Sequence, residues 1–214
     1  MRYKNIIFDL DGTLLDTSEG IKDAVRFTIE KMGYRHLEDN EIDSFIGPPI
    51  QNSLINHFGC TTEEAQRGAD VFREYYKNVS LLKASPYKGI YELMGFIIRN
   101  DMNAAVATYK REDYALKLLN AFKFNDYCRV MHGADNFNQM TKSDIIKICV
   151  YELGGKVDES LYVGDTNGDL KGATECGMEF VGVTYGFGFK PEDRYNFKTV
   201  DSCEELLEYL KSTF

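Results

Sequence analysis

The sequence has 214 residues and lacks features that several classes of protein require. No apolar run approaches the length of a membrane-spanning helix, so we do not expect the chain to be a membrane protein. Lys and Arg number 25 against 34 Asp and Glu, a net charge of −9. Because they form no basic stripe, nucleic-acid binding is not expected either. The same charge repels phosphorylated molecules at long range, so chemistry on a phosphate would need local positive charge.

Metal-binding patterns of Cys and His are missing as well. The 3 histidines show no zinc-ligand spacing to Cys or to one another. The 5 cysteines include no Cys-x-x-Cys pair. Their odd number and the absence of a secretory leader predict free thiols and a cytoplasmic protein.

The sequence does have two acidic clusters, each following a short apolar run. Residues 6–8 predict a buried strand, and a second short strand is predicted at residues 161–163. Both runs lead into acidic residues and glycine, at the edge where open α/β sheets bind their ligands. The acidic residues are Asp9, Asp11, Asp165 and Asp169. Oxygen ligands of this kind suit a hard cation such as Mg²⁺.

The order of the remaining elements indicates an α/β fold. From residue 86 onward, predicted strands alternate with predicted helices. This alternation predicts a parallel sheet with right-handed crossovers, in a three-layer Rossmann-like core. We expect strands at 102–108, 128–132, 161–164 and 179–184, and helices at 88–99, 111–122, 142–153, 168–176 and 202–211.

The stretch before Pro86 interrupts this alternation. It shows helical periodicity and no convincing strand, with helices predicted from Thr17 or Ser18 to Gly33, at 39–46, at 50–58 and at 61–80. We therefore divide the chain into an α/β core domain, residues 1–16 and 86–214, and an inserted α-helical cap domain, residues 17–85. Such an insertion would sit over the carboxyl end of the sheet, as a lid.

Two further side chains are candidates for the same pocket. Thr108 ends a predicted strand and offers a hydroxyl and a backbone N–H to an anion. Lys142 brings positive charge to a helix N-terminus. Taken alone, Thr108 fits a capping residue and Lys142 a solvated helix residue. Beside a carboxylate cluster, the pair suits a phosphate that is bridged to a cation.

Four segments together resemble the motifs of the haloacid dehalogenase superfamily of aspartate-nucleophile phosphohydrolases. Within it they resemble the phosphoglycolate-phosphatase-like branch, which has a helical cap after the first strand. Residues 8–17, FDLDGTLLDT, match the first motif, and residues 164–169, GDTNGD, match the fourth. Residues 106–108, VAT, followed by Lys110, fit the second, and Thr141-Lys142 fits the third. One departure is Tyr109, where family members usually have Ser or Asn.

The resemblance implies a mechanism. Asp9 would attack phosphorus and form an aspartyl-phosphate, and Asp11 would protonate the leaving oxygen and later deprotonate water. Mg²⁺ would be bound by Asp9, the backbone carbonyl of Asp11, and Asp165. Thr108 and Lys142 would hold the transferring phosphoryl oxygens.

For two positions the resemblance leaves more than one assignment: the role of Asp169 and the identity of the phosphate-binding lysine. Asp169 is expected to orient the metal shell or Lys142 rather than to bind the metal directly. Lys110 and Lys147 are rivals of Lys142, which we prefer because Thr141 immediately precedes it at a helix start.

The predicted function is a Mg²⁺-dependent phosphatase of small phosphorylated metabolites. A phosphomutase or pyrophosphatase of the same family is the alternative within catalysis, although the family resemblance implies that Thr13 after Gly12 favours hydrolysis over mutase chemistry. A non-catalytic regulatory phosphate-binding protein is the alternative from another class, and it is disfavoured because no expected Asp, Thr or Lys is substituted. Substrate specificity is expected from the cap loop and from the second motif, at Gly47, Gln51, Asn52 and Tyr109. The sequence names neither the substrate nor the oligomeric state.

Overall fold

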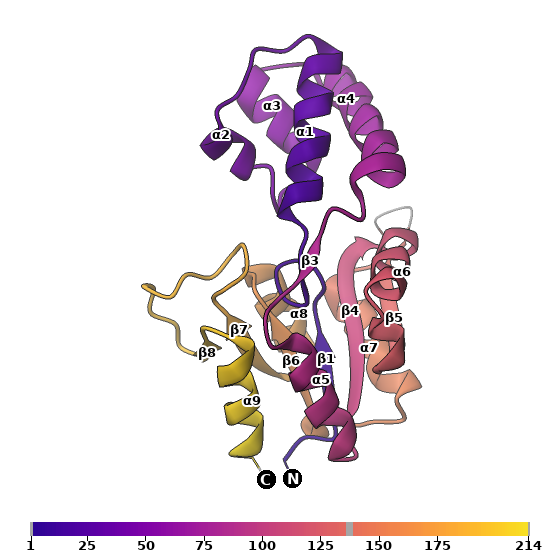
Figure 1. Cartoon of the computed structure of the whole chain (residues 1–214), viewed down its shortest axis with the longest axis vertical. Helices are drawn as coiled ribbons and strands as arrows, with labels where there is room; N and C mark the ends of the chain where they lie inside the picture. The colour runs from indigo at the N-terminus through magenta and orange to yellow at the C-terminus, as the bar shows by residue number, and fades with distance from the viewer. Residues whose placement is uncertain (1, 136–138, 214) are drawn as a thin grey trace. The chain divides into compact units, whose positions relative to one another are not determined.

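The computed structural model describes residues 2–135 and 139–213 (Figure 1). The chain forms two compact units, one made of Met1–Asp16 and Pro86–Phe214 and the other of Thr17–Ser85. Each unit has a hydrophobic cluster of its own. No helix in the described part of the chain is long and apolar enough to span a membrane.

The first unit contains a parallel sheet in the strand order β5-β4-β1-β6-β7-β8. The strands are β1 Asn5–Phe8, β4 Asn103–Arg111, β5 Cys128–Ala134, β6 Ser160–Gly164, β7 Glu179–Val183 and β8 Lys198–Val200. The predicted α/β class is therefore confirmed. The strands differ from the prediction in their extent: β4 continues past Thr108 to Arg111, and β5 continues past residue 132 to Ala134. The short edge strand β8 was not predicted.

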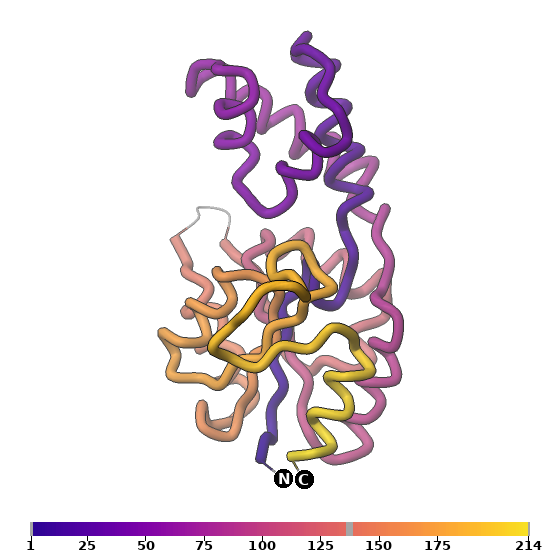
Figure 2. The backbone as a smooth tube through the Cα atoms, turned by 90° about the vertical axis from the view of Figure 1, so that its left-hand side faces the viewer, coloured from indigo at the N-terminus to yellow at the C-terminus, as the bar shows by residue number. Residues whose placement is uncertain are grey.

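Helices cover both faces of this sheet, and Figure 2 shows the layers from the side. Helices α7 and α8 pack against each other on one face, and α5 and α9 pack against each other on the opposite face (Figure 1). Helix α6 packs against β4 and β5. The helices are α5 Ile90–Arg99, α6 Glu112–Ala121, α7 Lys142–Glu152, α8 Asn167–Glu175 and α9 Cys203–Lys211, with 3-10 turns η2 Phe124–Asp126 and η3 Val157–Glu159.

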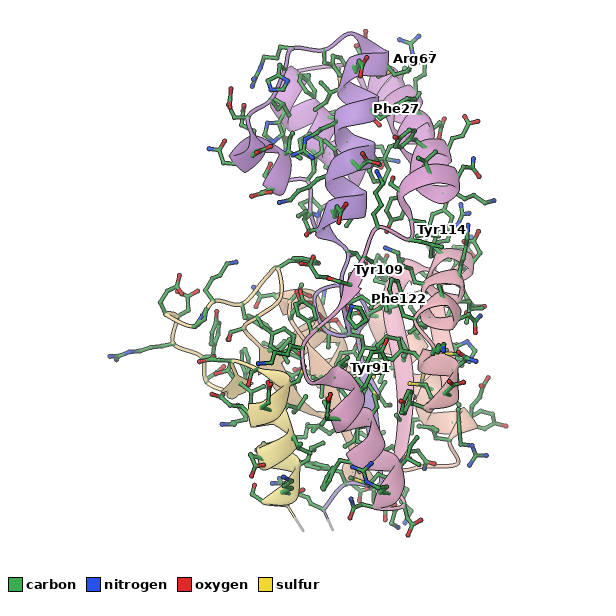
Figure 3. The ribbon with its side chains drawn as sticks, viewed as in Figure 1. Phe27, Arg67, Tyr91, Tyr109, Tyr114 and Phe122 are labelled. Carbon is green, nitrogen blue, oxygen red and sulfur yellow. The ribbon has the colours of Figure 1, made fainter. Side chains whose placement is uncertain are left out.

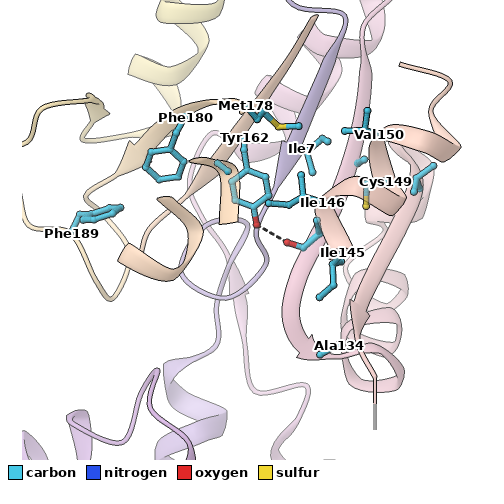
Figure 4. Packing of buried hydrophobic residues seen from close by; sticks show 14 residues of the cluster. Ile7, Ala134, Ile145, Ile146, Cys149, Val150, Tyr162, Met178, Phe180 and Phe189 are labelled. Carbon is cyan, nitrogen blue, oxygen red and sulfur yellow. Dashed lines mark hydrogen bonds between the residues drawn. The ribbon is translucent and has the colours of Figure 1, made fainter. Parts of the chain in front are cut away.

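The core between the sheet and α7 fixes the central strands (Figure 4). Ile7 of β1 is in register with Ala105 of β4 and with Tyr162 of β6. Because side chains alternate along a strand, these three lie on one face, where they pack with Ile145 and Ile146 of α7. All five are fully buried, so the ends of β1, β4 and β6 are held in one rigid layer.

The second unit is helical, as predicted for this stretch. It contains α1 Ser18–Met32, α2 Asp39–Asp43, α3 Ile50–Phe58, α4 Thr62–Tyr75 and a π-helical turn, η1 Tyr76–Ser80. The helix predicted at 61–80 is thus divided, and the one predicted at 39–46 is shorter. Two strands of two residues each, β2 Leu15–Asp16 and β3 Ser85–Pro86, pair where the chain passes from one unit to the other.

The first and last turns of the helical unit are tied together. The amide of Gly20 donates to the carbonyl of Lys83 at 2.9 Å. Lys83 Nζ also donates to Asp23 Oδ2 at 2.8 Å. A Cβ on Gly20 would lie 2.4 Å from the carbonyl oxygen of Ser80, so only glycine permits this approach. The unit therefore closes its own ends.

Candidate active site

The strand ends of the central sheet bring the predicted acidic residues together. Asp9 directly follows β1, and its amide donates to the carbonyl of Val163 at 2.9 Å, which extends the pairing of β1 with β6. Asp165 directly follows β6. Carboxylate oxygens of Asp9, Asp165 and Asp169 lie within 4.8 Å of one another, and all three residues are buried.

Lys142 supplies the positive charge at this cluster. It is the first residue of α7, which begins with a capping box: Thr141 Oγ1 accepts from the Asp144 amide, and the Asp144 carboxylate accepts from the Thr141 amide. Its Nζ lies 2.7 Å from Asp9 Oδ1 and 2.7 Å from Asp169 Oδ1. Burial alone would lower the pKa of Lys142, but Asp169 and Asp9 outweigh burial and raise it well above its usual range. Lys142 is therefore a fixed ammonium group.

Asp169 contacts Lys142, and both of its carboxylate oxygens have partners. Its Oδ2 accepts from Thr166 Oγ1 at 2.6 Å and from the Thr166 amide at 3.0 Å. Its Oδ1 faces Lys142 and accepts from Tyr162 Oη at 3.4 Å. Because protein donors occupy both oxygens, this geometry favours a positioning role over direct metal binding.

Asp165 has the opposite character, since one of its oxygens is unsatisfied. Its Oδ2 accepts from the Phe187 amide at 2.7 Å. Its Oδ1 is buried and has no hydrogen-bond partner among the described residues. Burial, and then the charges of Asp9 and Asp169, raise the pKa of Asp165 to about 8.

Crowding affects Asp9 in the same direction. Burial and then the charge of Asp169 raise the pKa of Asp9 to about 6, against the lowering effect of Lys142. Three buried carboxylates around one ammonium group leave an excess of negative charge. An unsatisfied carboxylate oxygen inside such a cluster fits a hard divalent cation such as Mg²⁺, with Asp9 and Asp165 as carboxylate ligands.

Asp11 and Thr108 complete the predicted core residues. Asp11 does not share the lysine of Asp9: both of its carboxylate oxygens accept from Lys110 Nζ, at 2.9 and 3.2 Å. Thr108 is buried in β4, and its Oγ1 accepts from the Lys110 amide at 3.2 Å. The other rival lysine, Lys147, is exposed on α7. Lys142, preferred on sequence grounds, is the lysine that contacts Asp9.

The predicted specificity residues fall in both units. Tyr109 lies at the end of β4 (Figure 3) and is 53% exposed. Gly47, Gln51 and Asn52 lie in the helical unit. Gly47 has a φ of 102°, and Gln51 Nε2 donates to Gln66 Oε1 of α4 at 3.3 Å.

Sequence reasoning assigned no role in the site to two segments that support it. Tyr162, expected only as a strand residue, lies beneath Lys142, and its Oη donates to the carbonyl of Ala107 at 2.6 Å (Figure 4). The loop after β7 wraps Asp165: a Cβ on Gly186 would lie 2.5 Å from Asp165 Cβ, and one on Gly188 would lie 2.4 Å from its carbonyl oxygen. The glycines at residues 186 and 188 were the available signal for this close approach.

Comparison with known proteins is consistent with this geometry. The family model described as haloacid dehalogenase-like hydrolase matches residues 6–183. A 5'-nucleotidase of Pseudomonas aeruginosa is 31% identical over 207 residues, which covers 96% of this chain and 93% of that protein. Phosphoglycolate phosphatase 1 of the same bacterium is 27% identical over 190 residues, with 85% and 70% covered.

A solved structure matches over nearly the whole length. The crystal structure of a predicted phosphatase from Clostridium acetobutylicum is 28% identical, with a TM-score of 0.86, and the match covers 99% of this chain and 100% of that one. The fold agrees with that of this solved structure. The chain belongs to the haloacid dehalogenase-like hydrolase family and is an enzyme of its phosphatase type.

Proposed function

We propose that the protein is a Mg²⁺-dependent phosphatase that hydrolyses small phosphorylated metabolites through an aspartyl-phosphate on Asp9. The observation that carries this proposal is the Lys142 ammonium, held 2.7 Å from Asp9 by Asp169. A nucleophile that must approach an anionic phosphate needs such a charge beside it, in a site with little water.

The reaction takes two steps. In the first, a carboxylate oxygen of Asp9 attacks phosphorus and the bond to the leaving oxygen breaks, while Asp11 gives that oxygen a proton. In the second, water attacks the phosphorus of the aspartyl-phosphate, Asp11 accepts the proton, and the bond to Asp9 breaks. Inorganic phosphate leaves, and both carboxyl groups return to their starting forms.

The surrounding groups bind the phosphoryl oxygens and offset their charge. Lys142 and the hydroxyl and amide of Thr108 would contact these oxygens, and Asp169 would keep Lys142 in place. Asp9, Asp165 and the backbone carbonyl of Asp11 would hold Mg²⁺, which supplies positive charge that reduces the repulsion between nucleophile and substrate. The unsatisfied Oδ1 of Asp165 supports this assignment.

The names of the relatives support a small phosphate monoester as the substrate. One is named a 5'-nucleotidase and another a phosphoglycolate phosphatase, so both act on the phosphate of a small molecule. The core residues described above recognise only the phosphoryl group. Discrimination between leaving groups is then assigned to Tyr109 and to the residues of the helical unit.

The test is the Asp9→Asn variant, which keeps the size of the side chain and removes the attacking charge. Release of phosphate from p-nitrophenyl phosphate in Mg²⁺ should fall by roughly 10³-fold or more, as for removal of a nucleophile. The matched control is Asp158→Asn, an exposed residue of η3 at the opposite end of β6, which should keep full activity. Activity of Asp9→Asn within about tenfold of the wild type would overturn the mechanism.

A further inference from the structure

A second lysine with a largely buried side chain lies at the site, and the mechanism above does not use it. Lys110 Nζ donates to both carboxylate oxygens of Asp11, at 2.9 and 3.2 Å. The side chain of Lys110 is only 9% exposed and that of Asp11 is 23% exposed. A charge-assisted hydrogen bond of this kind is stronger than a neutral one, so it restrains the position of the carboxylate.

The backbone explains why Lys110 reaches inward. Strand β4 does not end at Thr108 but continues to Arg111. Along this extension Thr108 is buried, Tyr109 is 53% exposed and the side chain of Lys110 is turned inward. The pairing of β4 with β5 is irregular between Ala107 and Arg111, so this segment does not follow the regular register of the sheet.

The neighbouring strand fixes this segment closely. A Cβ on Gly133 of β5 would lie 2.5 Å from the carbonyl oxygen of Lys110 and 2.5 Å from Cα of Glu112. Only a glycine permits this approach, so the backbone at Lys110 is packed against β5. The Cα atom from which the Lys110 side chain extends is therefore held in a fixed position.

The two lysines contact different aspartates. Lys142 contacts Asp9 and Asp169, whereas Lys110 contacts Asp11. We infer that Lys110 is a positioning residue that holds the Asp11 carboxyl group at the leaving oxygen of the substrate. This inference rests on the proposed function, in which Asp11 transfers the proton.

The chemistry makes the inference specific. Protonation matters most for a poor leaving group such as an alkoxide, and least for a stable one such as p-nitrophenolate. Misplacing a catalytic group by about 1 Å can cost on the order of 10²-fold in rate. Loss of Lys110 should therefore slow alkyl phosphates far more than aryl phosphates.

The experiment compares kcat/KM for glycerol phosphate and for p-nitrophenyl phosphate in the full chain with Mg²⁺. We expect Lys110→Met to lower the value for glycerol phosphate by about 10²-fold, and to change the ratio of the two values by about tenfold or more. Lys147→Met, an exposed residue of α7, is the matched control and should leave both values unchanged. Lys142→Met should lower both by similar factors, since it contacts the transferring group in every substrate.

A double-mutant cycle keeps the inference testable if Lys110→Met folds poorly. Asp11→Asn removes the charge that Lys110 balances, so the pair Asp11→Asn and Lys110→Met leaves no unpaired carboxylate. In the Asp11→Asn background, Lys110→Met should no longer change the ratio. The inference would be overturned if Lys110→Met still changed the ratio in the Asp11→Asn background. It would also be overturned if the single Lys110→Met variant lost kcat/KM equally on both substrates, or lost none. A wild-type protein inactive on both phosphates would instead overturn the proposed function.

Discussion

At the residue scale, Gly12 holds the first acidic segment against the second. Its φ is 77°, in the left-handed region, and a Cβ at this position would lie 2.2 Å from Asp165 Oδ2. Asp165 is itself fixed by the Phe187 amide, so it cannot move away without losing a hydrogen bond of 2.7 Å. Any side chain at residue 12 must therefore displace a carboxylate that is assigned to the metal.

We predict that Gly12→Ala destabilises the fold and abolishes turnover. The left-handed φ alone should cost about 1–2 kcal/mol, and displacement of Asp165 should add to that cost. The control is Gly177→Ala, in the same unit, with a φ of 68° and nothing within 4 Å of an added Cβ. Urea unfolding and phosphate release measure both effects. Equal losses of stability and activity in the two variants would contradict the steric account.

The crowded carboxylates predict dependence on a metal ion. EDTA should abolish phosphate release and Mg²⁺ should restore it, whereas Ca²⁺ should substitute poorly because its looser coordination misplaces the attacking group. Mg²⁺ should also raise the melting temperature of the wild type, because it relieves repulsion around Asp165, and should do so much less in Asp165→Asn. Full turnover in excess chelator would be incompatible with this prediction.

At the scale of secondary-structure elements, His132 joins a strand to two helices. Its Nδ1 lies 3.3 Å from Glu112 Oε2 of α6, and its Nε2 lies 3.0 Å from Glu152 Oε2 of α7. Burial alone would lower the pKa of His132, but the hydrogen bonds to Glu152 and Glu112 outweigh it and raise the pKa. When protonated, the ring can pair with both carboxylates and so tie α6 and α7 to β5.

This cluster predicts a specific dependence of stability on pH. Because the folded pKa of His132 is raised, its contribution is fully present below the unfolded value of about 6.5 and is lost as pH rises through the folded value. All three side chains are partly exposed, so the contribution should be at most about 1 kcal/mol. Urea unfolding of the wild type and His132→Gln at several pH values should differ most at low pH. A difference in unfolding free energy between the two proteins that grows with rising pH would contradict this prediction. His36→Gln, exposed in the helical unit, is the control.

Local sequence signals identified most elements, while pairing between distant segments was harder to predict. Helices α4 and α7 start where Thr61 and Thr141 form capping boxes, and both starts were predicted. Strand β8 has three residues, too few to show alternation, and among the described residues it pairs with β7 alone, at the edge of the sheet. The same limit applies to the site: Lys142 was chosen from its place after Thr141, but the pairing of Lys110 with Asp11 depends on how far β4 extends.

At the scale of the whole molecule, we propose that the helical unit determines which substrates are used. The candidate side chains are Gln51, at the start of α3, and the exposed Asn52 beside it. Replacing both by Ala should change the ranking of metabolite phosphates by kcat/KM and leave hydrolysis of p-nitrophenyl phosphate within about threefold of the wild type.

The control for this prediction is Gln66→Ala. Gln51 Nε2 donates a hydrogen bond to Gln66 Oε1, and the double variant loses this bond. Gln66→Ala also removes it but leaves the side chains of Gln51 and Asn52 in place. Its substrate ranking should therefore match that of the wild type. An unchanged ranking in the Gln51→Ala and Asn52→Ala double variant would contradict the assignment of specificity to this loop.

The tied ends of the helical unit also bear on how the chain folds. Strand β1 must find β4 and β6, and the contacts of Asn5 with Asn103 and Ser160 span 98 and 155 residues. A helical unit that forms early, with Gly20 bonded to Lys83, shortens the loop that the first of these contacts must close. The entropy saved is about 1 kcal/mol, and rates of folding fall with sequence separation. A substitution that loosens the Gly20 contact should therefore slow the assembly of a sheet to which Gly20 does not belong.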